Sequence, residues 1–180
     1  MTNLPASDES FEHNVETKTL SIKEALTPEG AASLTPYGGV ALMAVLFGRN
    51  LTHLHRPDVD KKDNNLYGEF WKRHRNLDNI LAGISMALPS HFRLPSGVRN
   101  VNIVFTNMSI HTSTICLHQA AIYKADQNGM PAEVVSGSKI RCITAAAEIA
   151  SIMRIICHQD LSGVDAPAFF KPRSKLTSIR

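Results

Sequence analysis

Two stretches of this sequence contain residue types that could take part in chemistry. The first, FWKRHRNLDNILAGISMALPSHFRLP, places Arg75 and Asp78 within two helical turns of Trp71, the single tryptophan of the chain. The second, NMSIHTSTICLHQAAIYKA, carries His111 and His118 within an apolar seam. Such side chains could bind a metal, activate a nucleophile or contact a nucleic acid, and each of these possibilities makes a demand on spacing.

The histidine spacing argues against a metal site. His111 and His118 share a helix face, but seven residues separate them by about 10.5 Å along the axis, whereas zinc needs ligands at about 2 Å. His53 and His55 are two residues apart and point in different directions on a helix. The sequence has neither a CxxC pair nor an HExxH motif. We therefore interpret the histidines as satisfied core residues and predict no metal ligand.

No catalytic constellation is recognisable. Cys116 and His118 could form a nucleophile pair, but residues two apart on a helix do not face each other. There is no GxSxG motif, and Tyr37-Gly38-Gly39 lacks the preceding strand and the following lysine of a phosphate-binding loop. We therefore predict that the chain is not an enzyme and has no catalytic or cofactor-binding residue.

The basic tract around the tryptophan has a simple structural interpretation. Basic residues beside an aromatic ring could contact a nucleic acid. On a helix, however, Trp71 and Arg75 are one turn apart and can stack, and Asp78 follows Arg75 by three residues. We predict an Arg–Asp pair on a partly solvated face, and no DNA-binding residue.

Apolar residues recur at steps of three and four along most of the chain, as expected for amphipathic helices. The predicted seams are Val40, Ala44, Phe47, Leu51 and Leu54; Leu66, Phe70, His74, Leu77, Leu81, Ile84 and Leu88; Val101, Val104, Met108, His111, Ile115, His118, Ile122 and Ala125; and Ile140, Ile143, Ala147 and Ala150. The third seam is far longer than a typical strand. Because Ile149, Met153 and Ile156 widen the fourth seam, we expect much of that helix, from about 138 to 157, to be buried. The predicted fold class is all-α, an irregular array of about four main helices.

Local signals set the predicted boundaries of the first helices. Thr35 and Pro36 resemble an N-cap followed by proline at the first helical position. That helix should end near His55, because Pro57 disfavours a helical residue before it. Residues 21–26 could form one short helical turn, and residues 56–65 read as a charged loop.

Three regions follow from these patterns. Residues 1–20 lack periodicity and hold four acidic residues, so we predict a disordered N-terminal segment. Residues 21–157 form the predicted domain. Residues 158–180 read as an irregular basic tail that holds Lys171, Arg173, Lys175 and Arg180.

Composition limits the function classes further. The length of 180 residues suits one domain. Without the four basic residues of the tail, the net charge of +3 becomes −1, so the charge of the body does not support nucleic-acid binding.

The cysteines and the absence of a targeting segment indicate the compartment. Cys116, Cys142 and Cys157 lie far apart in apolar patterns, and we expect buried thiols in a reducing compartment. The sequence shows no signal peptide and no membrane-spanning run, so we expect a soluble intracellular protein.

Read together, residues 21–154 resemble the regulatory "middle homology" domain of fungal zinc-cluster transcription factors. The most specific parts are FWKRHRNLDNIL, the following LPSHFRLP, and NMSIHTSTICLHQAAIYKA. Eight residues match motif positions of that family: Trp71, Arg73, Arg75, Asp78, Leu88, Pro89, Leu117 and His118. We group His111, which lies in the same stretch as Leu117 and His118, with these residues.

The resemblance implies a nuclear regulator of RNA polymerase II genes, in which a separate N-terminal cluster of six cysteines holds zinc and reads DNA. This sequence has three cysteines, so we expect no zinc in this chain and no DNA binding without such a cluster. The sequence also leaves the family pattern after the fourth helix, and we hypothesise a fragment: a partial gene product, a truncated isoform or a mispredicted gene model. Expected partners are proteins, either full-length relatives or a second copy, and no membrane. The alternative is a small helical ligand-binding domain or enzyme with His111 and His118 in a pocket.

Overall fold

The computed structural model describes residues 2–56 and 65–158, and within them the regular secondary structure is helical. The elements are α1 (Asp8–Glu12), α2 (Ile22–Ala25), α3 (Pro28–Ala31), α4 (Pro36–His55), α5 (Glu69–Ala87), the 3-10 turn η1 (Ser90–Phe92), α6 (Val101–Gln127) and α7 (Ala132–His158). The predicted all-α fold with about four main helices is therefore confirmed. Most of the predicted loop at 56–65 and of the predicted tail at 158–180 lies outside the described residues.

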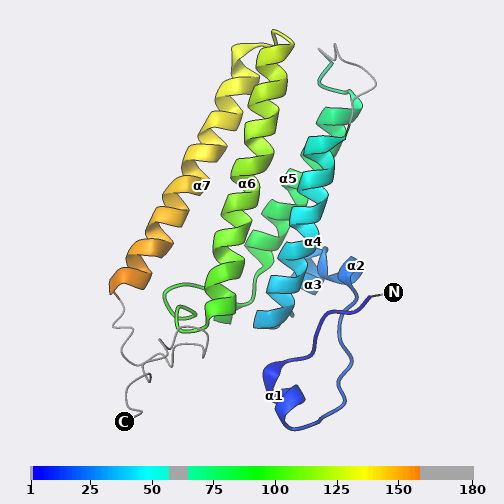
Figure 1. Cartoon of the computed structure of the whole chain (residues 1–180), viewed down its shortest axis with the longest axis vertical. Coiled ribbons are helices and arrows are strands. Elements are labelled where there is room, and N and C mark those ends of the chain that lie inside the picture. Colours follow the sequence, from blue (N-terminus) through cyan, green and yellow to red (C-terminus); the bar gives the residue numbers. More distant parts are fainter. Residues whose placement is uncertain (1, 57–64, 159–180) are drawn as a thin grey trace, which may run out of the picture.

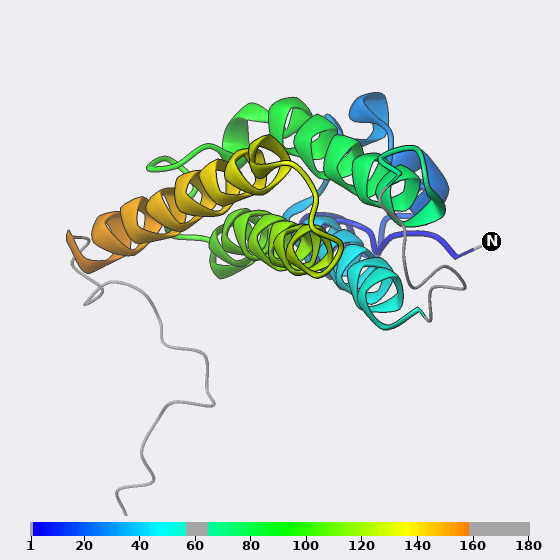
Figure 2. The same cartoon turned by 90° about the horizontal axis from the view of Figure 1, so that it is seen from above.

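Four long helices, α4 to α7, form the body of the molecule (Figure 1). The central helix is α6, which contacts α4, α5 and α7. Seen end-on, α4 and α7 lie on either side of α6, and α5 lies above them (Figure 2). The short helix α3 packs against α5. This arrangement brings the two chemically interesting stretches, on α5 and α6, side by side.

The predicted helix starts and stops agree with the structure in the first third of the chain. The Thr35 hydroxyl accepts a hydrogen bond from the Gly38 N–H at 3.0 Å, and Pro36 occupies the first turn of α4. This helix ends at His55, as predicted. The short turn predicted at 21–26 is α2, closed by a capping box in which Ser21 and Glu24 each bond the other's backbone N–H.

One glycine permits the close approach of α4 to α6. A Cβ atom at Gly39 would lie 2.8 Å from the Thr106 hydroxyl oxygen and 3.0 Å from the Phe92 ring. Both of these neighbours are buried and have no room to move away. The residue at position 39 is therefore set by packing between two helices and by the turn η1 below them.

The buried face of α4 is not the predicted one. We predict a seam of Val40, Ala44, Phe47, Leu51 and Leu54, but Ala44 and Leu51 are exposed and the other three are half-buried. The side chains buried on this helix are those of Leu42, Met43, Leu46, Asn50 and His53. Polar residues occupy the last turns of this face, so counting apolar residues selects a neighbouring face instead.

The other three long helices differ in how well the prediction holds. On α5 it is correct from Phe70 to Ile84, where every residue of the seam is buried. On α6 His118 and Ala125 of the predicted seam are buried, but the rest of the buried face is rotated from that seam. Beside apolar residues such as Ile110 and Leu117 it holds the small polar side chains of Thr106, Ser109 and Ser113. Small residues let helices approach closely, but they leave no hydrophobic signal in the sequence.

The prediction for α7 is wrong in both start and face. The helix begins at Ala132, about six residues earlier than predicted. Its buried residues are Ser138, Ala145 and Ile152, whereas Ile140 and Ile143 of the predicted seam are 63% and 70% exposed. The expectation of a largely buried helix is corrected accordingly: α7 covers one side of the array and presents an apolar stripe to solvent.

The N-terminal segment is ordered in its described part, 2–20, where we predict disorder. Leu4 is buried in the main core, and Asn3 pairs with Ser21 in an isolated antiparallel bridge. The Ser7 hydroxyl caps α1 by accepting a hydrogen bond from the Ser10 N–H at 3.2 Å. The buried Leu4 side chain and the Asn3–Ser21 bridge connect this polar segment to the helical body.

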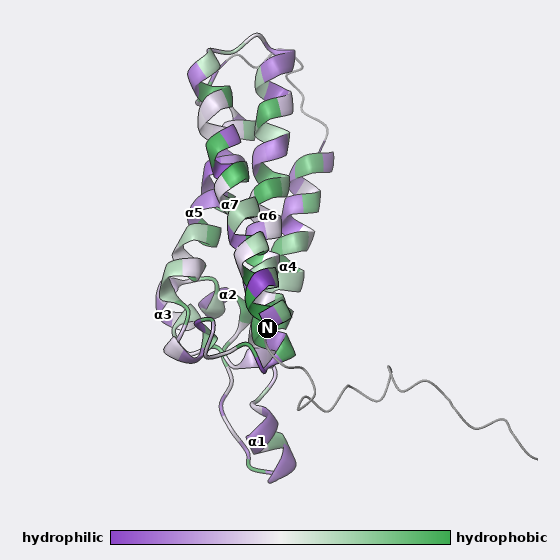
Figure 3. Ribbon diagram, turned by 90° about the vertical axis from the view of Figure 1, so that its left-hand side faces the viewer, coloured by the Kyte–Doolittle hydropathy of each residue, from purple (hydrophilic) through white to green (hydrophobic). Residues whose placement is uncertain are grey.

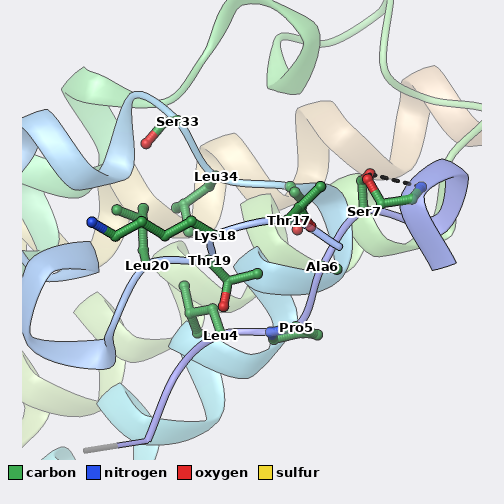
Figure 4. Close-up of a pocket in the computed structure, with 12 residues that line it drawn as sticks. Leu4, Pro5, Ala6, Ser7, Thr17, Lys18, Thr19, Leu20, Ser33 and Leu34 are labelled. Carbon is green, nitrogen blue, oxygen red and sulfur yellow. Dashed lines mark hydrogen bonds between the residues drawn. The ribbon is translucent and has the colours of Figure 1, made fainter. Parts of the chain in front are cut away.

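A hollow of about 340 Å³ lies between this segment and the loop before α4. Figure 4 shows the residues that line it. Leu4, Leu20 and Leu34 form its apolar part. Lys18 is the one ionisable residue among those that line it.

Candidate functional site

Motif residues of α5 and α6 meet a third helix at one junction. Asp78 of α5 accepts a hydrogen bond from the Arg141 guanidinium of α7 through Oδ1. The same carboxylate oxygen lies 3.3 Å from Nε2 of His118 on α6. Nδ1 of His118 lies 3.3 Å from the Ser138 hydroxyl on α7. We call Asp78, His118, Ser138 and Arg141 the α5–α6–α7 junction.

The tautomer of His118 decides which hydrogen bond its Nε2 atom makes. Nε2 lies 3.3 Å from Asp78 Oδ1 and 3.4 Å from Nε of Arg141. A protonated Nε2 donates to Asp78, whereas an unprotonated Nε2 accepts from Arg141. Both states tie α6 to a neighbouring helix, so the junction is satisfied in either tautomer.

Electrostatics at the junction favour the ionised form of Asp78. Partial burial alone would raise the pKa of Asp78, but hydrogen bonds from His118 and Arg141, together with the Arg141 charge, lower it to about 2. The side chains of Asp78 and Arg141 are 26% and 46% exposed, so solvent screens this pair and its net energy is modest. The junction is thus a partly solvated ion pair built over a buried histidine.

A chain of ring contacts continues from the junction into α5 and α4. The rings of His118 and His74 meet edge to face, with centroids 5.0 Å apart. His74 contacts Trp71, Trp71 contacts Phe70, and Phe70 contacts His53 at centroid distances of 5.8, 5.2 and 4.6 Å. These five rings connect three of the four long helices.

Burial changes the chemistry of two residues in this ring chain, His74 and Trp71. Burial, helped by the nearby His118, lowers the pKa of His74 to about 4, so its ring is neutral at neutral pH. Trp71 is only 3% exposed, and its indole N–H has no hydrogen-bond partner among the described residues. The ring chain is a packing element, and the ionised groups lie at its solvent-facing end.

The predicted Arg–Asp pair forms with a different arginine. We predict Arg75 as the partner of Asp78, but Arg75 is exposed and donates to the Leu66 carbonyl at 2.6 Å. Trp71 packs on Phe70 and His74 instead of stacking on Arg75. The actual partner, Arg141, comes from 63 residues further along the chain. Helical spacing within one stretch could not reveal it.

The remaining motif residues have structural positions. Leu88 is the C-cap of α5 and packs against the main core, and Pro89 precedes the turn η1. Leu117 is fully buried in the main core. Arg73 lines a cleft between α4 and α5 together with Arg49 and other residues of both helices. None of these four lies at the junction itself.

The groove that His111 lines is not lined by His118. His111 lines a groove of about 340 Å³ between α5 and α7, together with Arg141 and Glu148. Burial lowers the pKa of His111, against the opposing effect of Glu148. His118 is not among the lining residues and reaches the groove only through its contact with Arg141. This groove is therefore not the two-histidine pocket of the alternative hypothesis.

The cysteines differ from expectation in their burial. We predict buried thiols, but Cys116 and Cys142 are half-buried and Cys157 is exposed. Cys142 donates a weak hydrogen bond to the Ile115 carbonyl at 3.7 Å. In the described part of the chain, no three His, Cys, Asp or Glu side chains gather as a metal site would require. The residues present do not fit a zinc cluster, which needs six cysteines.

Reasoning from the sequence missed Arg141 and Ser138. Each stands on α7 in a stretch whose other residues, apart from Lys139, are apolar or small. They are three residues apart, so they lie on adjacent parts of one helix face. That spacing was the available signal, although nothing local indicates that the face meets α5 and α6.

The fold is a helical array with a three-helix junction, and the comparisons give its class: the chain is distantly related to fungal transcriptional activators. A pigment biosynthesis transcriptional activator of Monascus ruber is 23% identical over 151 residues, which cover 84% of this chain and 27% of that protein. A transcription factor of Aspergillus terreus is 24% identical and covers 86% of this chain and 25% of its own length. A citrinin biosynthesis transcriptional activator of Monascus ruber is 24% identical, with 85% and 30% covered.

The chain thus spans between 25% and 30% of the length of these relatives. No protein-family description matches the sequence, and no solved structure matches it. None of the helices in the described ranges is long and apolar enough to cross a membrane.

Proposed function

We propose that this chain is a regulatory or interaction domain of the middle homology type, acting in RNA polymerase II transcription in the nucleus. The observation that carries the proposal is the similarity to fungal transcriptional activators over 84% to 86% of the chain. Its partners are proteins. In such a protein DNA would be read by a zinc cluster, for which this sequence has too few cysteines.

The geometry supports a role in transmitting or restraining activation rather than in chemistry. The ionised groups at the junction, Asp78 and Arg141, neutralise each other, and His118 is buried beneath them. The pKa of Asp78 is lowered to about 2, so its carboxylate would be a weak general base at neutral pH. What the junction does is join three helices, so the relative positions of those helices depend on it.

A tethering experiment tests the proposal. The chain is fused between a heterologous DNA-binding domain and an activation domain, and reporter output is measured in a filamentous fungus. We expect output to change several-fold in comparison with a flexible linker of equal length at the same protein level. Equal output from the domain and the linker would contradict the proposed function.

A further inference from the structure

The outer face of α7 carries a continuous apolar stripe. The stripe consists of Ile140, Ile143, Ala147 and Ala150, which are all exposed. It lies on the side of the helix opposite the buried residues Ser138, Ala145 and Ile152. The helix forms one edge of the array in Figure 1, and Figure 3 looks onto that edge. None of the described helices covers this stripe.

The spacing of the stripe is that of a coiled-coil seam. Its members follow one another at steps of three, four and three, the alternation of positions a and d in a heptad. Ser136 and Arg154 continue the pattern by one step of four at either end. No charged residue interrupts the stripe between Ser136 and Ala150. A seam of this kind fits the matching face of another helix.

We propose that the outer face of α7 is a homodimer interface, in which two copies of α7 pack antiparallel about the level of Ala145. This inference does not depend on the proposed function. In this register Ile140 lies opposite Ala150 of the second copy, and Ile143 lies opposite Ala147 of the second copy. Every apolar layer then pairs a large side chain with a small one, which fills space without voids.

Charge favours the same register. Arg154 lies three residues, or about 4.5 Å along the axis, from Glu133 of the second copy, within reach of its long side chain. Both residues are exposed, and the two-fold symmetry places one such pair at each end of the interface. A parallel pairing would instead set Arg154 against Arg154 and Ala147 against Ala147, with repulsion in one layer and a gap in the other.

The size of the stripe sets the expected strength. One helix face with four apolar positions falls below the area of standard stable interfaces, so we expect a dissociation constant on the order of tens of micromolar. The dimer should therefore appear as a concentration-dependent equilibrium in sedimentation of the full chain.

A glutamate in the centre of the seam tests the interface. Ile143→Glu should weaken association at least about tenfold, because the charge would face Ala147 of the second copy in a dry layer. Ile143 is 70% exposed in the single chain, so its replacement should leave the helical circular-dichroism signal intact. Leu51→Glu is the matched control on α4, where the leucine is 53% exposed, and it should associate like wild type. A wild-type chain that stays monomeric at high micromolar concentration, or equal loss in both variants, would overturn the proposal.

Crosslinking with a short bismaleimide tests the orientation, in proteins whose Cys116 and Cys142 are serine. With Cys157→Ser added, Ala146→Cys should crosslink, because antiparallel packing brings the two copies of residue 146 together beside the two-fold axis. The native Cys157 should not crosslink to its counterpart, since 24 residues place the two thiols about 36 Å apart along the axis. Efficient coupling through Cys157 and none through position 146 would overturn the antiparallel arrangement.

Discussion

Asp78 of α5 accepts a hydrogen bond from Arg141 of α7, and this ion pair joins two helices that otherwise touch little, since α7 makes most of its contacts with α6. His118 lies directly beneath the pair and contacts both of its members. Because the three residues come from three helices, a change in any one of them alters how the helices are held together. This relationship gives the domain a long-range connection between residues that are 63 positions apart.

Removal of the charge at position 78 should destabilise the fold. In Asp78→Asn the Arg141 guanidinium loses its counter-ion, and we expect the free energy of unfolding to fall by about 1–2 kcal/mol, less than for a fully buried pair because both side chains are partly solvated. Urea denaturation measures the change. The control is Glu69→Gln, which breaks the exposed Lys72–Glu69 pair and should cost clearly less than Asp78→Asn, because solvent screens this pair. Equal costs in the two variants would show that the junction is no stronger than a surface ion pair.

Acid should remove the stabilisation of the fold that comes from the Asp78 charge. The folded-state pKa of Asp78 is lowered to about 2, below its value of about 3.9 in an unfolded chain. The stabilisation is therefore complete above about pH 4 and is lost as the pH falls towards 2. The difference in unfolding free energy between wild type and Asp78→Asn should shrink over that window. A difference that stays constant from pH 5 to pH 2 would mean that the Asp78 charge is not its source.

His74 should make the fold sensitive to mild acid. Its folded-state pKa is lowered to about 4 from an ordinary value of 6.5, so the unfolded chain binds the proton more readily. Stability should be greatest above pH 6.5 and should fall by on the order of 2–3 kcal/mol as the pH drops to about 4. His74→Phe keeps a ring in this site and should flatten that part of the curve, measured as unfolding free energy against pH. His55→Gln, at an exposed position on α4, is the matched control. A His74→Phe curve that follows wild type would contradict this prediction.

Two glycines of α4 should respond in opposite ways to alanine. Gly39→Ala forces a methyl group to within 2.8 Å of the Thr106 hydroxyl oxygen, and we expect a loss of about 1–3 kcal/mol from overpacking. Gly48→Ala meets nothing within 4 Å and should gain about 0.5–1 kcal/mol from lower chain entropy and better helix propensity. Thermal unfolding separates the two cases, and a stabilised Gly39→Ala would contradict the close contact between α4 and α6.

The fold class could be predicted from the sequence, but the faces of the helices could be predicted only in part. The α5 seam was correct because its buried positions are mostly large and apolar, from Phe70 to Ile84. The α4 and α6 faces were missed because Asn50, Thr106 and Ser113 occupy buried positions. On α7 the sequence seam was a real pattern, but it faces solvent. Periodicity identifies an apolar face without saying what covers it.

The candidate site could also be predicted only in part. Asp78 and His118 were singled out from their unusual types and positions, and the structure places them 3.3 Å apart. The prediction assigned the wrong arginine, since spacing along one helix connects Asp78 only to Arg75. Arg141 joins through tertiary packing of α7, and no local rule carries that information.

The tethered reporter measurement tests the central claim most directly, when wild type, Asp78→Asn and Glu69→Gln are compared side by side at equal protein level. The account predicts that the wild-type domain changes reporter output relative to the linker, that Glu69→Gln does the same, and that Asp78→Asn moves output back towards the linker value. A wild-type domain that behaves like the linker, or an Asp78→Asn variant that regulates as fully as wild type, would contradict it.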